Sequence, residues 1–251
     1  MRTLLYITTL LVACSGHILP AQDIKQEATA DLIRIRDVFT AHTSFSMNMH
    51  YSFFPEHHSK TPVETHTGYY CKMGEALYLS ELYGTTTISN GEVVMVKDDS
   101  SKIIMVKKFF KEENPPLTHE QFEKMLKICN SVEKIKGRTE DEKAYSLLFK
   151  EKIENLVKMD ILFNAKTYNV RKIIMYFDRP IQDHHFANVD ANPQYPKPRL
   201  EVEYINFNGN STYTKEKFSV KKYIGKINNK WELTAAYAGK YTLFDQTTVN
   251  K

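Results

Sequence analysis

The chain has 251 residues, of which 42% are hydrophobic and 25% charged; this composition excludes a disordered tail, a collagen and a peptide-sized scaffold. Lys and Arg number 34 against 30 Asp and Glu. Because these charges are interspersed along the chain, no basic arm indicates a nucleic-acid partner. The 15 Tyr and 14 Phe outnumber the 9 Gly, and this balance favours a strand-rich protein.

The first residues have the pattern of an export signal. Arg2 precedes a short apolar run, Leu4 to Ala13, which is too short to span a bilayer. Signal peptidase cleavage after Ala21 would remove residues 1–21 and leave a mature chain of residues 22–251.

A second interpretation of the same segment is a lipoprotein signal. Leu11-Val12-Ala13-Cys14 resembles a bacterial lipobox, so residues 1–13 would be removed and Cys14 would become the acylated N-terminus. An uncleaved anchor is the third alternative. The first two predict a periplasmic protein, or one anchored to the outer membrane if Cys14 is acylated.

An amphipathic helix is predicted after the signal, ending near His42. Its apolar positions recur every three or four residues; they are Ile24, Ala28, Leu32, Ile35 and Phe39.

The next segment is the clearest strand pattern in the chain. Its apolar side chains alternate strictly with polar ones; they are Phe45, Met47, Met49, Tyr51 and Phe53.

Strand patterns fill most of the remaining sequence. Asn90-Gly91 and the turn 164–167 predict hairpins. The expected strands cover residues 65–73, 76–82, 85–89, 92–97, 102–108, 145–149, 159–163, 170–177, 200–207, 218–224 and 231–243.

A second amphipathic helix is predicted after Pro116, ending before Gly137. The spacing of its apolar residues is helical; they are Leu117, Phe122, Met125, Leu126, Cys129, Val132 and Ile135. Residues 179–198, with four prolines, are expected to form a long loop. No internal repeat or linker divides the chain, so residues 22–251 are expected to form one domain. The predicted fold class is α+β, mainly β: an antiparallel, incomplete (half-open) β-barrel with two covering helices.

The order of these segments resembles the outer-membrane lipoprotein carrier (LolA-like) family. The resemblance covers about residues 28–177 and is one of pattern and order; its elements are the helix 28–42 leading into Thr43-Ser44-Phe45-Ser46-Met47, then Gly68-Tyr69-Tyr70, Ile88-Ser89-Asn90-Gly91-Glu92-Val93-Val94, Phe163-Asn164-Ala165-Lys166-Thr167-Tyr168 and Val170-Arg171-Lys172-Ile173. It implies a half-barrel whose apolar face, covered by helices, shelters acyl chains from water without metal, cofactor or bond chemistry. The chain departs from the family in lacking Trp in 92–96, in residues 179–198 and in longer C-terminal strands.

The leading hypothesis is therefore an exported, non-enzymatic protein that binds a lipid or a lipoprotein acyl chain. Seven side chains are candidates for an apolar cavity, with a filled core as the alternative for each; they are Leu32, Phe39, Phe45, Met47, Met49, Tyr51 and Phe53. The alternative function is an envelope scaffold or a protein- or glycan-binding protein that uses exposed tyrosines and the 179–198 loop. An enzyme ranks third, because no catalytic motif is present.

Two clusters offer metal-ligand chemistry, Glu56-His57-His58 and Asp183-His184-His185. Adjacent histidines on an extended chain point apart, so a site would need both loops to meet, and solvated histidines are the favoured alternative. No metal or cofactor is expected. Cys71 and Cys129 could pair or remain buried thiols, and Glu201 and Glu203 are expected on a solvated strand face.

Overall fold

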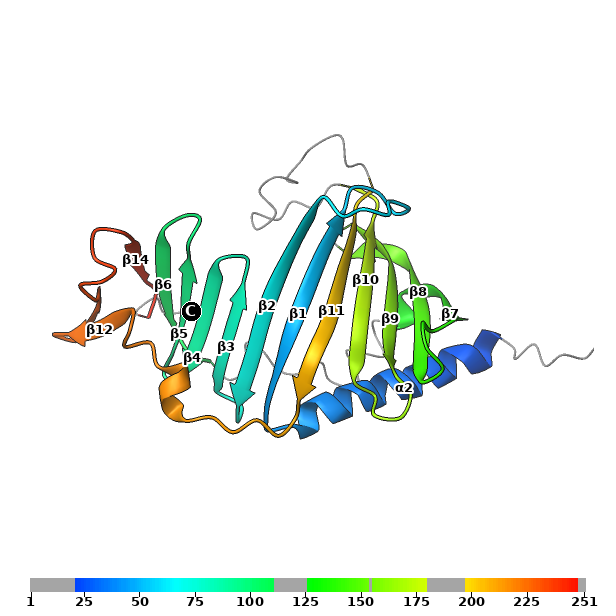
Figure 1. The fold of residues 1–251 in the computed structure, drawn as a ribbon, viewed down its shortest axis with the longest axis horizontal. Coiled ribbons are helices and arrows are strands. Elements are labelled where there is room, and N and C mark those ends of the chain that lie inside the picture. Colours follow the sequence, from blue (N-terminus) through cyan, green and yellow to red (C-terminus); the bar gives the residue numbers. More distant parts are fainter. Residues whose placement is uncertain (1–20, 111–125, 154, 180–196, 248–251) are drawn as a thin grey trace, which may run out of the picture.

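The structure, a computed structural model, describes residues 21–110, 126–153, 155–179 and 197–247. Helix α2 (Ala21–Ala41) packs on one face of a 12-stranded sheet (Figure 1). In chain order the strands of this sheet are β1 (Ser44–Phe54), β2 (Glu64–Met73), β3 (Leu77–Leu82), β4 (Thr85–Asn90), β5 (Val93–Asp98), β6 (Ile103–Lys108), β7 (Cys129–Ile135), β8 (Glu142–Ile153), β9 (Leu156–Asn164), β10 (Val170–Phe177), β11 (Arg199–Asn208) and β14 (Thr242–Asp245).

The strand order is β14-β6-β5-β4-β3-β2-β1-β11-β10-β9-β8-β7. The chain begins in the middle of the sheet, runs outward to β6, resumes at the far edge with β7 and returns to β11, which pairs with β1. All pairs are antiparallel except that of β14 with β6. The sheet does not close on itself, which confirms the predicted half-open architecture.

The two faces of the sheet carry separate cores. The face that packs against α2, called here the helix face, includes Leu32 of the helix and Phe53, Tyr145 and Phe163 of the strands. On the opposite face, a C-terminal segment (residues 210–247) covers strands β2 to β6, where Phe218 packs against Met95 and its neighbours. This segment contains the 3-10 helix η2 (Lys215–Phe218) and the hairpin of β12 (Ile224–Ile227) and β13 (Lys230–Leu233).

Polar contacts hold the N-terminal half of α2 against the sheet. Asp31, only 3% exposed, accepts hydrogen bonds from the Tyr145 hydroxyl at 2.7 Å and the Lys143 ammonium at 2.9 Å. One turn earlier, Glu27 accepts from Lys134 at 3.0 Å. Because buried carboxylates are costly without partners, these bonds fix both the position and the rotation of the helix.

The second predicted helix is wrong over residues 129–135, which form β7. A register shift between Cys129 and Ser131 adds a residue to the strand, so Cys129 and Val132, three positions apart, are both buried. Such a bulge imitates helical spacing in the sequence. The first part of the predicted helix, residues 117–125, lies outside the described residues.

The C-terminal strand predictions are also partly wrong. Residues 218–223 form the end of η2 and a turn, Ile224 begins β12, and only the ends of 231–243 are strands. The apolar residues of this segment are buried because they pack against the face of the sheet, so burial alone explains their pattern.

The two cysteines within the described part of the chain are free thiols. Cys71 lies in the core under the C-terminal segment and Cys129 in the core of the helix face, so the sheet separates them. Burial raises the pKa of both thiols.

Candidate functional site: an apolar cavity beneath helix α2

A cavity of about 330 Å³ lies between the C-terminal half of α2 and the middle of the sheet. This volume falls at the lower end of the range typical of ligand sites. The lining side chains come from α2, β1, the β9–β10 turn, β10 and β11; they belong to Ile35, Arg36, Val38, Phe39, Thr40, Met47, Tyr168, Asn169, Val170, Ile173, Tyr204 and Phe207.

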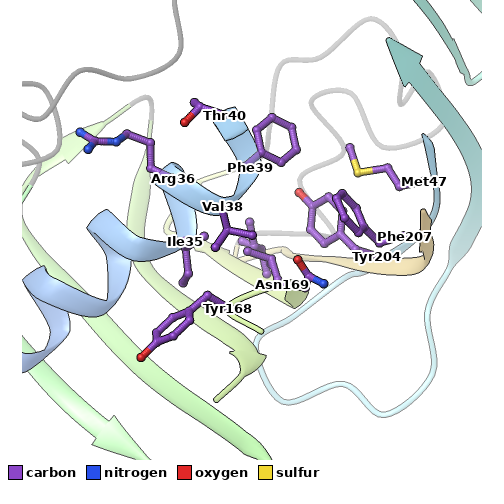
Figure 2. Close-up of a pocket in the computed structure, with 12 residues that line it drawn as sticks. Ile35, Arg36, Val38, Phe39, Thr40, Met47, Tyr168, Asn169, Tyr204 and Phe207 are labelled. Atoms are coloured by element: carbon purple, nitrogen blue, oxygen red, sulfur yellow. The ribbon is translucent and has the colours of Figure 1, made fainter. Parts of the chain in front are cut away.

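The helix provides the roof of the cavity through one stripe of side chains. Ala28 and Leu32 are almost fully buried in the core, whereas Ile35 and Phe39, further along the same stripe, line the cavity together with Val38. Figure 2 shows Ile35 and Val38 turned toward the strands beneath the helix, the Phe39 ring projecting to one side, and the Arg36 guanidinium pointing away. The helix is therefore packed tightly at its N-terminal half and stands over open space at its C-terminal half.

The strand β10 lies beneath this space. Every residue of β10 except Phe177 is only partly buried, although the strand is interior to the sheet. Its neighbour β9 contains four consecutive buried residues, from Asp160 to Phe163. Partial exposure of Val170 and Ile173 is what a cavity above β10 produces.

The alternating strand 44–53 contributes less to the cavity than the sequence predicts. Met47 lines it, but Met49 and Phe53 are buried in the core and Tyr51 packs against that core. Phe45 is completely buried, and its ring centroid lies 4.7 Å from that of Phe39 and 5.5 Å from that of Phe207. Of the seven sequence candidates, Phe39 and Met47 therefore line the cavity, Phe45 supports its wall, and Leu32, Met49, Tyr51 and Phe53 belong to the core.

A bulge in β11 places a residue that the sequence did not single out. The register against β1 shifts between residues 205 and 208, and Asn206 adopts a φ of 55°, a left-handed conformation that Asn tolerates better than most residues. The extra residue turns Phe207 onto the helix face, against His42 and Phe45. Tyr204 also lines the cavity, because it lies on the same face of β11 as Leu200 and Val202.

The chemistry of the cavity is apolar with few polar groups. Burial, with a smaller contribution from Tyr51, raises the pKa of Tyr204 to about 12, so its hydroxyl remains a neutral group at ordinary pH. At the rim, Arg34 donates a hydrogen bond of 2.7 Å to the Tyr168 hydroxyl. Such a lining suits an alkyl chain better than a charged ligand.

The remaining sequence candidates lie away from this cavity. His57 donates to the Phe177 carbonyl oxygen at 2.8 Å and packs on Tyr176, and within the described ranges no group of three or more His, Cys, Asp or Glu is arranged to hold a metal ion. Residues 183–185, most of the 179–198 loop, Cys14 and the rest of residues 1–20 lie outside the described residues. Glu201 and Glu203 occupy the face opposite α2, where Lys172 lies 2.5 and 3.2 Å from their carboxylates.

None of the helices in the described part of the chain is both long enough and apolar enough to cross a membrane.

Comparison with known proteins gives similarity in structure only. No protein-family model matches the sequence, and no curated protein matches it. The structure is similar to that of a conserved protein from Thermus thermophilus, with a TM-score of 0.43 and 9% sequence identity over 76% of this chain and 92% of that chain. It is similar to that of a LolA superfamily protein from Nitrosomonas europaea, with a TM-score of 0.32 and 10% identity over 80% of this chain and 98% of that chain. It is also similar to that of the lipoprotein LppX from Mycobacterium tuberculosis, with a TM-score of 0.36 and 8% identity over 74% of this chain and 97% of that chain.

Proposed function

We propose that this chain is an exported, non-enzymatic protein that binds an acyl chain of a lipid or lipoprotein between α2 and the sheet. The observation that carries the proposal is the cavity of about 330 Å³ beneath Ile35, Val38 and Phe39. Its walls are mainly aliphatic and aromatic, so the ligand it favours is one that gains from leaving water without needing polar contacts.

The expected affinity follows from the area that the ligand buries. Each methylene moved from water into the cavity contributes about 0.8 kcal/mol, so about eight methylenes would contribute roughly 6 kcal/mol before the cost of association. Among the described residues that line the cavity, the one charged side chain, Arg36, points away from it (Figure 2), so selectivity among chains of similar length is expected to be low.

Mass spectrometry of protein purified from the envelope of the producing cells tests both halves of the proposal. Organic extraction should release fatty acids or lipids in a stoichiometric amount, and the intact mass should show a chain starting at Gln22 or an acylated Cys14. Protein that retains residues 1–21 and releases no lipid would contradict it.

A cavity-filling substitution gives the sharper test. Val38→Trp places a large side chain where Val38 faces the sheet and should weaken binding of a fluorescent fatty acid at least tenfold, while the melting temperature is kept or raised. Val63→Trp is the matched control, because Val63 is 48% exposed and lies outside the cavity. Equal affinity of the two variants for the fluorescent fatty acid would contradict the assignment of binding to this cavity.

A further inference from the structure

A second groove lies on the face of the sheet opposite α2, where the C-terminal segment ends its cover. Its volume is about 510 Å³, within the range of ligand sites. The groove lies over β11, β1, β2, β3 and β4; its lining residues include Asn48, His50, Thr67, Tyr69, Glu81, Thr86, Asp99, Ile205 and Asn206.

The strand register explains why these side chains meet. Residues directly opposite each other in paired strands lie on one face, and the pairs Ile205–Asn48, Asn48–Tyr69, Tyr69–Glu81 and Glu81–Thr86 form a continuous row across five strands. His50 and Thr67 form the next pair on the same face.

The neighbouring row on the other side is apolar. It contains Cys71, Leu79, Ile88 and Met95, all buried beneath the C-terminal segment. Two residues further along these strands the side chains are polar: Tyr69 and Glu81 are partly or fully exposed, whereas Thr86 and Lys97 are buried. Tyr69 marks the boundary, where its hydroxyl is 3.3 Å from that of Tyr213.

The polar side chains of the groove have unused hydrogen-bonding capacity. Further along β11 on the same face, polar residues are satisfied by ion pairs, such as those of Glu203 with Lys172 and Arg138. In the groove, by contrast, several side chains make no hydrogen bond or ion pair to other residues that the structure describes; these are Asn48, His50, Thr67, Glu81, Thr86 and Asn206. The Thr85 hydroxyl oxygen, also in the lining, is buried without a partner there.

The lining also defines the charge of a suitable ligand. It includes no Lys or Arg, and Lys97, which is opposite Thr86 at the end of the row, is already paired with the Asp99 carboxylate, so no free cation of the row is available to a phosphate, a sulfate or an anionic lipid headgroup. Of its two carboxylates, Asp99 is already 2.6 Å from the Lys97 ammonium. Beside apolar side chains such as Leu82 and Ile205, what remains is a set of amides, hydroxyls, an imidazole and one carboxylate, which can both donate and accept hydrogen bonds.

We propose that this groove is a second binding site, specific for a neutral saccharide. Sugar hydroxyls match the mixed donors and acceptors of the row, and Ile205, 43% exposed, offers an apolar contact to the C–H face of a sugar ring. A peptide strand is a poorer occupant, because the floor consists of interior strands whose backbone groups are paired with each other.

Calorimetric titration with maltotriose, cellotriose, chitotriose and laminaritriose tests the proposal. At least one of them should bind, with an affinity that changes less than twofold between 0.05 and 0.5 M NaCl, since no charge on the ligand is involved. The double variant Asn48→Ala, Glu81→Ala should weaken this binding at least tenfold, and both side chains are exposed, so the fold is expected to persist.

Asn130→Ala with Glu133→Ala is the matched control, because both residues are exposed on a strand, β7, at the far edge of the sheet. It should bind as the wild type does. Failure of all four trisaccharides, strong salt dependence, or equal binding by the two double variants would overturn the proposal. The fatty-acid titration of Val38→Trp reports on the other face, so either proposal can fail alone.

Discussion

At the scale of the residue, Asn206 decides which side chains reach the cavity. Simple alternation from Leu200, Val202 and Tyr204 would put position 206 on the helix face and Phe207 on the other. The left-handed Asn206 reverses this order and brings Phe207 against Phe45. Sequence periodicity does not predict the bulge, because a single Asn is its only local signal.

Replacing Asn206 with Val tests this role. A β-branched residue resists positive φ, so the variant should lose about 1–2 kcal/mol of unfolding free energy and bind the fluorescent fatty acid more weakly as Phe207 turns away. Asn206→Gly, which adopts the same φ without strain, should retain binding. Urea denaturation and probe titration measure both effects, and a Val variant that matches the Gly variant would contradict the account.

At the scale of the element, helical and strand periodicities predicted α2 and most strands because one face of each is buried. The helix expected from residue 24 to His42 is observed as Ala21–Ala41, and the 164–167 turn joins β9 to β10 as expected. The prediction failed at β7, where a bulge produced helical spacing. It also failed to show how α2 is held, because Asp31 meets Lys143 and Tyr145 from more than 100 positions away.

The attachment of α2 is expected to depend on pH. The hydrogen bond from Lys134, opposed by burial and supported by Lys143, lowers the pKa of Glu27 below its usual 4.5. A carboxyl group with a lowered folded-state pKa binds fewer protons when folded, so its stabilisation is complete above about pH 5 and is lost as the pH falls through the folded pKa.

Urea midpoints between pH 7 and pH 3 measure this dependence. The urea midpoint of the wild type should be constant above about pH 5 and decrease below pH 4. The midpoint of Glu27→Gln should decrease less, because the substitution removes one of the titrating groups. Glu133→Gln, an exposed position on β7, is the control and should keep the wild-type slope. An unchanged slope for Glu27→Gln would argue against a role for this carboxylate.

At the scale of the whole molecule, one sheet carries two cores on opposite faces. The order of helices and strand runs, with hairpin-length turns, predicted a half-open sheet. The C-terminal segment and its cover over Cys71, Ile88 and Met95 were not predicted, because its burial comes from contact with distant strands. The same long-range packing creates the row from Asn48 to Thr86, which no local motif signals.

The two buried thiols allow the cooperation of these cores to be measured. With Cys14 replaced by Ser, single variants that keep only Cys71 or only Cys129 should resist a thiol reagent when folded, since both residues are buried. Because the cores share one sheet, both thiols should become reactive at the same urea concentration. Clearly separated midpoints would show that the faces unfold independently.

The seam between β1 and β11 governs the order in which the chain can fold. It joins Phe53 to Leu200, whereas the other pairs on either side of it are mostly hairpins between consecutive strands. Helix α2 precedes the strands of the sheet in the chain, yet its partners on β7 and β8 follow about a hundred residues later. We therefore expect slow folding dominated by late, long-range closure. Until that closure helix α2 stays undocked, with its apolar stripe accessible to a binding partner.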